Sequence, residues 1–153
     1  MSLPLAAAPA WLEDRREYGT IFIRLCVGYR LVYGTIDNVA SWARMVEFEH
    51  FLAAHGVPFA LLSAVVSVWA QFLCGLLFIV GLWTRPAGAV MVVNFIVAIV
   101  VAHIGRPYLD NFDAIMMLAA GAFFLFHGAG ALSVESWLAS RGATRRANRS
   151  VRA

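Results

Sequence analysis

The chain has 153 residues, of which 61% are hydrophobic and 14% charged, and its formal net charge is +3. A soluble domain is about half apolar and about a quarter charged, so this composition excludes an ordinary water-soluble protein. Much of the positive charge is gathered near the C-terminus: Arg141, Arg145, Arg146, Arg149 and Arg152. Because a basic tail beside membrane segments has anionic lipid headgroups as counterions, the charge indicates membrane lipids as partners and not nucleic acid.

Residues 1–17 are expected to form a cytoplasmic N-terminal segment. Its first part, Met1 to Trp11, contains neither a basic leader nor an apolar run long enough for a signal peptide, so the first membrane helix would direct insertion. A helix needs about 20 mostly apolar residues to cross the hydrocarbon layer. Four segments are predicted to do so: residues 18–39, 59–83, 86–104 and 110–128. The sequence thus predicts an all-α fold, a bundle of four transmembrane helices within a domain of residues 18–138.

The first of these helices is the least apolar, because Arg24, Arg30 and Asp37 interrupt it. An arginine near mid-membrane costs about 2.5–3.5 kcal/mol on insertion scales. Neighbouring helices must compensate for that cost, so we expect a tightly packed bundle. Arg24 lies nearer the predicted cytoplasmic end, where its side chain is expected to snorkel toward the headgroups.

The connecting segments complete the predicted topology. Residues 40–58 form the one long connection, which is expected to contain a short interfacial helix, and Ser133 is expected to cap a short segment after the fourth helix. The arginine-rich residues 139–153 are predicted to be a disordered tail. With four crossings, the side that holds both termini carries eight arginines and the opposite side two. The positive-inside rule then places both termini in the cytoplasm.

Polar residues recur at helical spacing in the first two predicted membrane helices. On the first helix they are Cys26, Arg30, Tyr33 and Asp37. On the second they are Ser63, Ser67, Gln71 and Cys74. Each set lies along one helix face. Because the helices would be antiparallel, Cys26 matches Cys74 in depth, and we expect the two stripes to face each other inside the bundle.

Eight residues are candidates for an intramembrane polar pocket: Arg24, Arg30, Tyr33, Asp37, Gln71, Asn94, His103 and Asp113. In a functional interpretation, Arg30 and Tyr33 bind a quinone headgroup and His103 shuttles protons. In a structural one, Arg30 pairs with Asp37 or Asp113 and locks the helices together. We favour the structural interpretation, because any polar group in lipid needs a partner.

Other chemistry has weaker support in the sequence. Asn94 is expected to hydrogen-bond between helices. The histidines lack the spacing of a metal-binding motif, so no metal site is predicted. Cys26 and Cys74 could pair as thiols, although two inert buried thiols are the favoured interpretation.

The sequence resembles the DoxX family of small four-helix membrane proteins, over about residues 21–138. Four motifs carry the resemblance: Ile23-Arg24-Leu25 with Gly28 and Gly34; His55-Gly56-Val57-Pro58; Gln71, Gly75, Gly81, Thr84 and Arg85; and Gly128, Gly130, Ser133 and Glu135. Two positions depart from the family pattern, since Gln71 stands where glutamate is usual and Asp37 where lysine is frequent. An Arg30–Asp37 ion pair is one hypothesis for a rewired substitute.

The resemblance implies a bacterial inner-membrane protein associated with quinol oxidation, thiosulfate-to-quinone electron transfer or thiol-stress oxidoreductase complexes. It favours an accessory subunit, with no cofactor of its own, that contacts partner subunits or further copies of itself. A quinone-handling oxidoreductase is the first alternative, and a small transporter or a lipid- or cargo-binding protein is the second. A catalyst would need ligands for a redox centre, and none is visible in the sequence.

Overall fold

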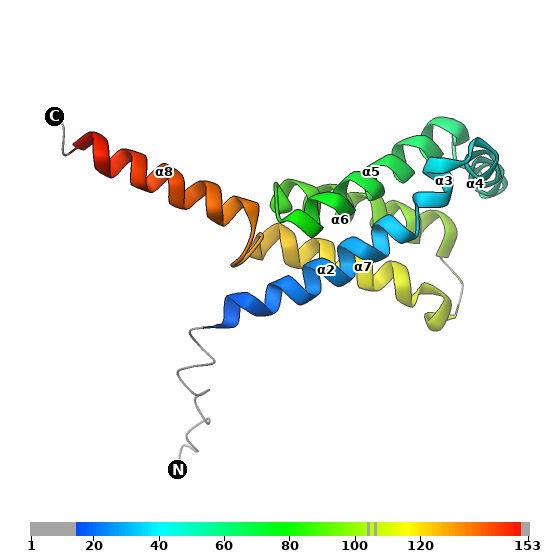
Figure 1. Ribbon diagram of the computed structural model, residues 1–153. Helices are drawn as coiled ribbons and strands as arrows, with labels where there is room; N and C mark the ends of the chain where they lie inside the picture. Colours follow the sequence, from blue (N-terminus) through cyan, green and yellow to red (C-terminus); the bar gives the residue numbers. More distant parts are fainter. Residues whose placement is uncertain (1–14, 104, 106, 151–153) are drawn as a thin grey trace, which may run out of the picture.

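The computed structural model of the chain describes residues 15–103, 105 and 107–150, and every regular element in this part is helical (Figure 1). The predicted all-α class is therefore confirmed for these residues. The elements follow in the order η1 (Arg16–Tyr18), α2 (Gly19–Tyr33), α3 (Ile36–Ala40), α4 (Trp42–Ala54), α5 (Ala60–Val80), α6 (Thr84–Ala98), the π-helical turn η2 (Ile99–His103), α7 (Tyr108–His127) and α8 (Val134–Ser150).

The helices α2, α5, α6 and α7 run side by side, each antiparallel to the next in the chain (Figure 1). The short helices α3 and α4 lie at one end of this bundle, and α8 projects from the other end, where α2 begins. The predicted helix in the 40–58 connection is confirmed as α4, which packs on α5 through Met45, Ala64 and Val68.

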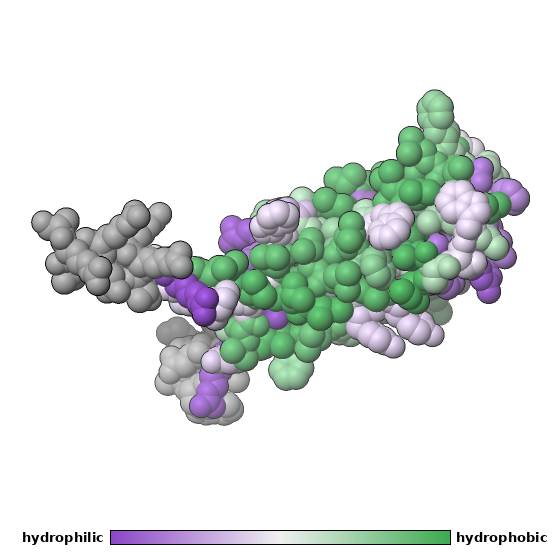
Figure 2. Space-filling view, turned by 45° about the horizontal axis from the view of Figure 1, so that its top comes forward, coloured by the Kyte–Doolittle hydropathy of each residue, from purple (hydrophilic) through white to green (hydrophobic). Residues whose placement is uncertain are grey.

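Within the described residues, three helical stretches are long and apolar enough to cross a membrane: Ala60–Val80, Thr84–Ala102 and Tyr108–His127. Apolar side chains cover the middle of the visible face of the bundle, with polar ones toward its ends (Figure 2). The helix α2 has 15 residues and does not reach the spanning length. The expected count of four spanning helices is therefore not confirmed.

The first predicted membrane helix, residues 18–39, is interrupted between α2 and α3. The Gly34 N–H donates to the Arg30 carbonyl oxygen at 2.9 Å, and the Thr35 hydroxyl donates to the Leu31 carbonyl oxygen at 2.7 Å. These bonds satisfy the last carbonyls of α2, which otherwise would lack partners. The chain then restarts as a helix at Ile36.

Two glycine pairs set the packing of the bundle. A Cβ on Gly28 would lie 2.7 Å from the Gly75 carbonyl oxygen, where α2 crosses α5. A Cβ on Gly88 would lie 2.7 Å from the Gly121 carbonyl oxygen, where α6 crosses α7. The backbones therefore touch at both crossings, which is how membrane helices pack closely. Phe78 and Phe124, both fully buried with ring centroids 4.5 Å apart, join the two pairs.

The predicted disorder of residues 139–153 is wrong for the part of that tail that the structure describes, because α8 continues to Ser150. Its start is capped reciprocally: the Ser136 N–H donates to the Ser133 hydroxyl at 3.1 Å, and the Ser133 N–H donates to the Ser136 hydroxyl at 3.2 Å. Alanine and arginine, which favour helices, then follow repeatedly. Within α8, the Arg141 guanidinium lies over the Trp137 ring one turn earlier, 3.7 Å from the ring centroid.

Candidate functional site

The polar stripe of α2 faces outward, which corrects the expected seam between the two polar stripes. Its residues Cys26, Arg30 and Tyr33 are all exposed, as is Asp37, which lies beyond α2 in α3. The face of α2 that packs inward is Thr20, Arg24, Val27, Gly28 and Leu31. The reason is the Gly28–Gly75 contact, because it rotates α2 so that its small residue meets α5 and its larger polar residues point away.

An ion pair on this outward face joins α2 to α7. The Arg30 guanidinium binds the Asp113 carboxylate, and the two side chains remain 46% and 56% exposed. Asp113 was one of the two predicted partners, and the alternative Arg30–Asp37 pair is wrong. Asp37 instead lies near Arg44, whose own partner is Glu47 at 2.8 Å. Glu47 and, to a smaller extent, Asp37 raise the pKa of Arg44.

Aromatic rings flank this ion pair. Tyr33 stacks on Tyr29 with ring centroids 5.7 Å apart, and both side chains are about two-thirds exposed. We call Cys26, Tyr29, Arg30, Tyr33 and Asp113 the outward patch. It combines a charged pair, two phenols and a thiol on the lateral surface of an otherwise apolar bundle.

Arg24 does not snorkel, which is a second correction. Its side chain is buried at 3% exposure, and its guanidinium contacts the segment that joins α7 to α8. Nη1 donates to the Ala129 carbonyl oxygen at 2.8 Å and Nη2 to the Leu132 carbonyl oxygen at 3.1 Å. A Cβ on Gly81 would lie 2.6 Å from Nη1, so the glycine at the end of α5 makes room for the guanidinium. Arg24 therefore fastens α2 to the segment between α7 and α8.

The polar stripe of α5 faces α6 and not α2. The Ser67 hydroxyl donates to Asn94 Oδ1 at 2.8 Å, and Gln71 Nε2 donates to the Ser67 hydroxyl at 3.2 Å. The interhelical hydrogen bond expected for Asn94 is therefore confirmed, and Gln71 extends the same network through Ser67. Cys74, farther along the same helix, packs in the apolar core.

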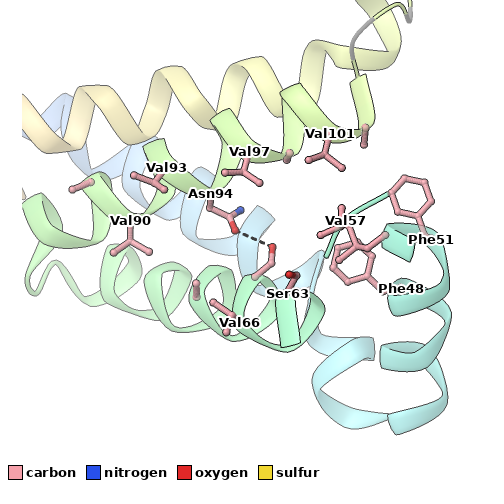
Figure 3. Close-up of a pocket in the computed structure, with 16 residues that line it drawn as sticks. Phe48, Phe51, Val57, Ser63, Val66, Val90, Val93, Asn94, Val97 and Val101 are labelled. Carbon is pink, nitrogen blue, oxygen red and sulfur yellow. Dashed lines mark hydrogen bonds between the residues drawn. The ribbon is translucent and has the colours of Figure 1, made fainter. Parts of the chain in front are cut away.

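Beside this polar network lies a groove of about 640 Å³ between α4, α5 and α6 (Figure 3). Phe48 and Phe51 line it from α4, and aliphatic side chains of α5 and α6 line the rest. The sequence analysis missed this groove. Its signal was the mixture of alanine, valine and serine on facing sides of α5 and α6, but only the position of α4 turns that surface into a concavity.

The remaining candidates do not converge on one site. The side chain of His103 lies outside the described residues. Among the residues that the structure does describe, no group of three or more His, Cys, Asp or Glu side chains could hold a metal ion. Cys26 and Cys74 are free, the first exposed and the second buried, so they do not form the pair that the sequence left open.

Comparison with known families decides the assignment. The DoxX family model matches residues 19–104, which is more than half of the chain. The chain belongs to the DoxX family. It is a membrane protein of that family with apolar helices. No curated protein and no solved structure matches it.

The matched DoxX segment ends near η2, yet the later Gly-Ala-Gly and Ser-Val-Glu residues pack back onto it. Glu135 Oε1 accepts a hydrogen bond from the Thr84 N–H at 2.8 Å, at the start of α6. The Glu135 N–H donates to the Gly81 carbonyl oxygen at 3.1 Å. A Cβ on Gly130 would lie 2.9 Å from the Cβ of Thr20. The last of the four DoxX-like motifs therefore closes one end of the bundle against Thr20, Gly81 and Thr84.

Proposed function

We propose that this DoxX-family chain is an accessory subunit of a respiratory or redox complex in the bacterial inner membrane, and that it docks on a partner subunit through the outward patch. The observation that carries the proposal is the Arg30–Asp113 ion pair. Arg30 lies in the last turn of α2 and Asp113 in the second turn of α7, within a helix long and apolar enough to cross a membrane. About half of each side chain is exposed.

The physical argument concerns what surrounds that pair. In hydrocarbon, each unsatisfied polar group costs several kcal/mol, and ionised groups inside membranes almost always face protein or water. On an isolated bundle the exposed atoms of Arg30 and Asp113 would face lipid tails. A partner helix that supplies acceptors to Arg30 and donors to Asp113 removes this cost.

The same proposal includes four crossings and a cytoplasmic location for both termini. We assign the fourth crossing to η1, α2 and α3 together, because the chain from Arg16 to Ala40 runs the length of the bundle (Figure 1). The eight arginines on the side of the termini, against two on the other, support the orientation.

Site-directed photocrosslinking tests the docking surface. Benzoylphenylalanine in place of Tyr33 puts a probe into the outward patch, and the same residue in place of Trp69 puts one on the exposed side of α5. In native membranes, irradiation of the Tyr33→benzoylphenylalanine variant should give an adduct with a redox-cofactor-bearing membrane protein. The Trp69 variant is the matched control and should not give it.

Two results would contradict the proposal. Adducts of the Tyr33 variant with lipid alone would mean that the outward patch faces the bilayer. Adducts only with a second copy of the chain would make the patch a self-association surface. If the proposal is right, adding Asp113→Asn to the Tyr33→benzoylphenylalanine variant should reduce the yield of the partner adduct, because this change removes the negative charge of the ion pair.

The quinone alternative has less support in this geometry. The Arg30 charge is already compensated by Asp113, which weakens its attraction for the carbonyl oxygen of a headgroup. Asp37, which the quinone hypothesis also used, lies near Arg44 at the start of α4.

A further inference from the structure

The groove between α4, α5 and α6 is separate from the outward patch and is built differently. None of the described residues that line it carries a charge, and its polar lining residues are Ser63, Ser67 and Asn94. Valine and alanine side chains form most of its walls (Figure 3). Its volume of about 640 Å³ falls in the range of about 300–1,000 Å³ typical of small-molecule sites.

A buried amide without an acceptor lies beside this groove. Asn94 reaches from α6 toward α5, where its Oδ1 accepts from Ser67 (Figure 3). Its Nδ2 is shielded from solvent and has no hydrogen-bond partner among the described residues. Two other polar side chains of this region have different partners: the Ser63 hydroxyl donates to the Pro58 carbonyl oxygen, and Gln71 Nε2 donates to the Ser67 hydroxyl. A donor left unpaired in an apolar surrounding is unfavourable, so the site calls for an acceptor.

The depth of Asn94 restricts the source of that acceptor. It is eight residues from Ala102, the end of its spanning stretch, which places it about 12 Å along the helix from that end. The ester oxygens of a phospholipid stay near its charged headgroup, at the membrane surface. A molecule whose oxygen reaches Asn94 must therefore have an uncharged head that can enter the hydrocarbon layer.

We propose that this groove binds one neutral acyl lipid, an uncharged long-chain ester whose carbonyl oxygen accepts a hydrogen bond from the Asn94 amide once the side chain turns its Nδ2 into the groove. The aliphatic walls at Val66, Val93 and Val97 fit a flexible chain. The aromatic rings of the groove, Phe48 and Phe51, belong to α4 at its far end and offer no stacking surface beside the donor. A single donor matches a single ester carbonyl.

Photolabelling of the detergent-extracted full chain tests the proposal. The probe is dioleoylglycerol with a diazirine in one acyl chain, and the readout is label on peptides of α5 and α6. Asn94→Leu should reduce labelling by up to about tenfold, the factor expected for one hydrogen bond. Val97→Trp should fill the groove and abolish labelling, whereas Ile96→Trp, at a neighbouring exposed position outside the groove, should not.

Competition distinguishes the occupants. Unlabelled dioleoylglycerol should displace the probe, and phosphatidylglycerol should not. Equal displacement by phosphatidylglycerol would overturn the proposal, since it would describe ordinary boundary lipid, and stronger displacement by a prenyl quinone would assign the groove to a different ligand. Labelling that survives in Val97→Trp would place the probe elsewhere and refute the site. Because these variants lie away from the outward patch, the outcome is independent of partner crosslinking at Tyr33.

Discussion

Replacing Arg24 by methionine should destabilise the bundle more than any change to the exposed ion pair. Methionine keeps much of the length and volume of the side chain but cannot donate to the carbonyl oxygens of Ala129 and Leu132. These two carbonyls lie between α7 and α8, so the substitution detaches that segment from α2. Glu135 also loses the positive charge that lies near its carboxylate.

The size of the expected loss in the free energy of unfolding follows from the groups that Arg24→Met leaves without a partner. A hydrogen bond to a charged group contributes about 1.5–3 kcal/mol, and removing one partner of a buried charged cluster costs about 3–5 kcal/mol. Arg24 Nε has no partner among the described residues, so the wild-type protein already bears part of the cost of burying the guanidinium. We therefore expect a loss of about 3 kcal/mol in the free energy of unfolding. In a chain of this size that loss lowers the thermal midpoint by roughly 6–12 °C.

The assay is thermal unfolding of the purified protein in a mild detergent, followed by circular dichroism. Arg30→Met is the matched control, because its ion pair is half-exposed and should contribute about 1 kcal/mol or less. Glu135→Gln should fall between the two, since its amide oxygen can still accept from the Thr84 N–H. The reasoning is refuted if Arg24→Met melts within 2 °C of the wild type, or if Arg30→Met is the less stable variant.

Three further outcomes are expected. Gly75→Leu should separate α2 from α5 and lower the yield of folded protein in size-exclusion chromatography, because even a Cβ there would lie 2.9 Å from the Gly28 carbonyl oxygen. Arg30→Asp and Asp113→Arg should each abolish the partner adduct of the Tyr33 photoprobe, and the double exchange should restore it if the pair itself is recognised. Glu47→Gln should leave the thermal midpoint unchanged within error, although Glu47 raises the pKa of Arg44, because that pair lies on the exposed surface of α4.

The broad architecture could be predicted because membrane helices obey strong, local constraints. Apolar runs of sufficient length located α5, α6 and α7 to within a few residues, and the resemblance of short motifs identified the family. The rotation of α2 could not be obtained in the same way. Spacing showed that Cys26, Arg30, Tyr33 and Asp37 share a face, but periodicity alone does not state which face is buried.

The residue that decided the rotation was a glycine and not a polar residue. Gly28 and Gly75 bring two backbones into contact, and this packing outweighs the pairing of polar side chains across the same interface. Two consequences follow that the sequence reasoning reversed: Arg30 is outside, and Arg24 is inside. The groove was missed for a related reason, because a concavity depends on how three helices diverge and not on the pattern of any one of them.

The two glycine crossings also determine where the bundle can yield. In each crossing a glycine meets the backbone of the opposite helix, so a shift at that point must move backbone and not only a flexible side chain. The contact between α5 and α6 is made by side chains around Ser67 and Asn94, and the groove lies along it. The molecule therefore consists of two closely packed helix pairs, α2 with α5 and α6 with α7. The contact between α5 and α6, which joins these pairs, is the one that can yield more easily. A displacement of one pair against the other would be taken up at this contact and at the residues that bridge the pairs, Phe78 with Phe124 in the core and Arg30 with Asp113 on the surface.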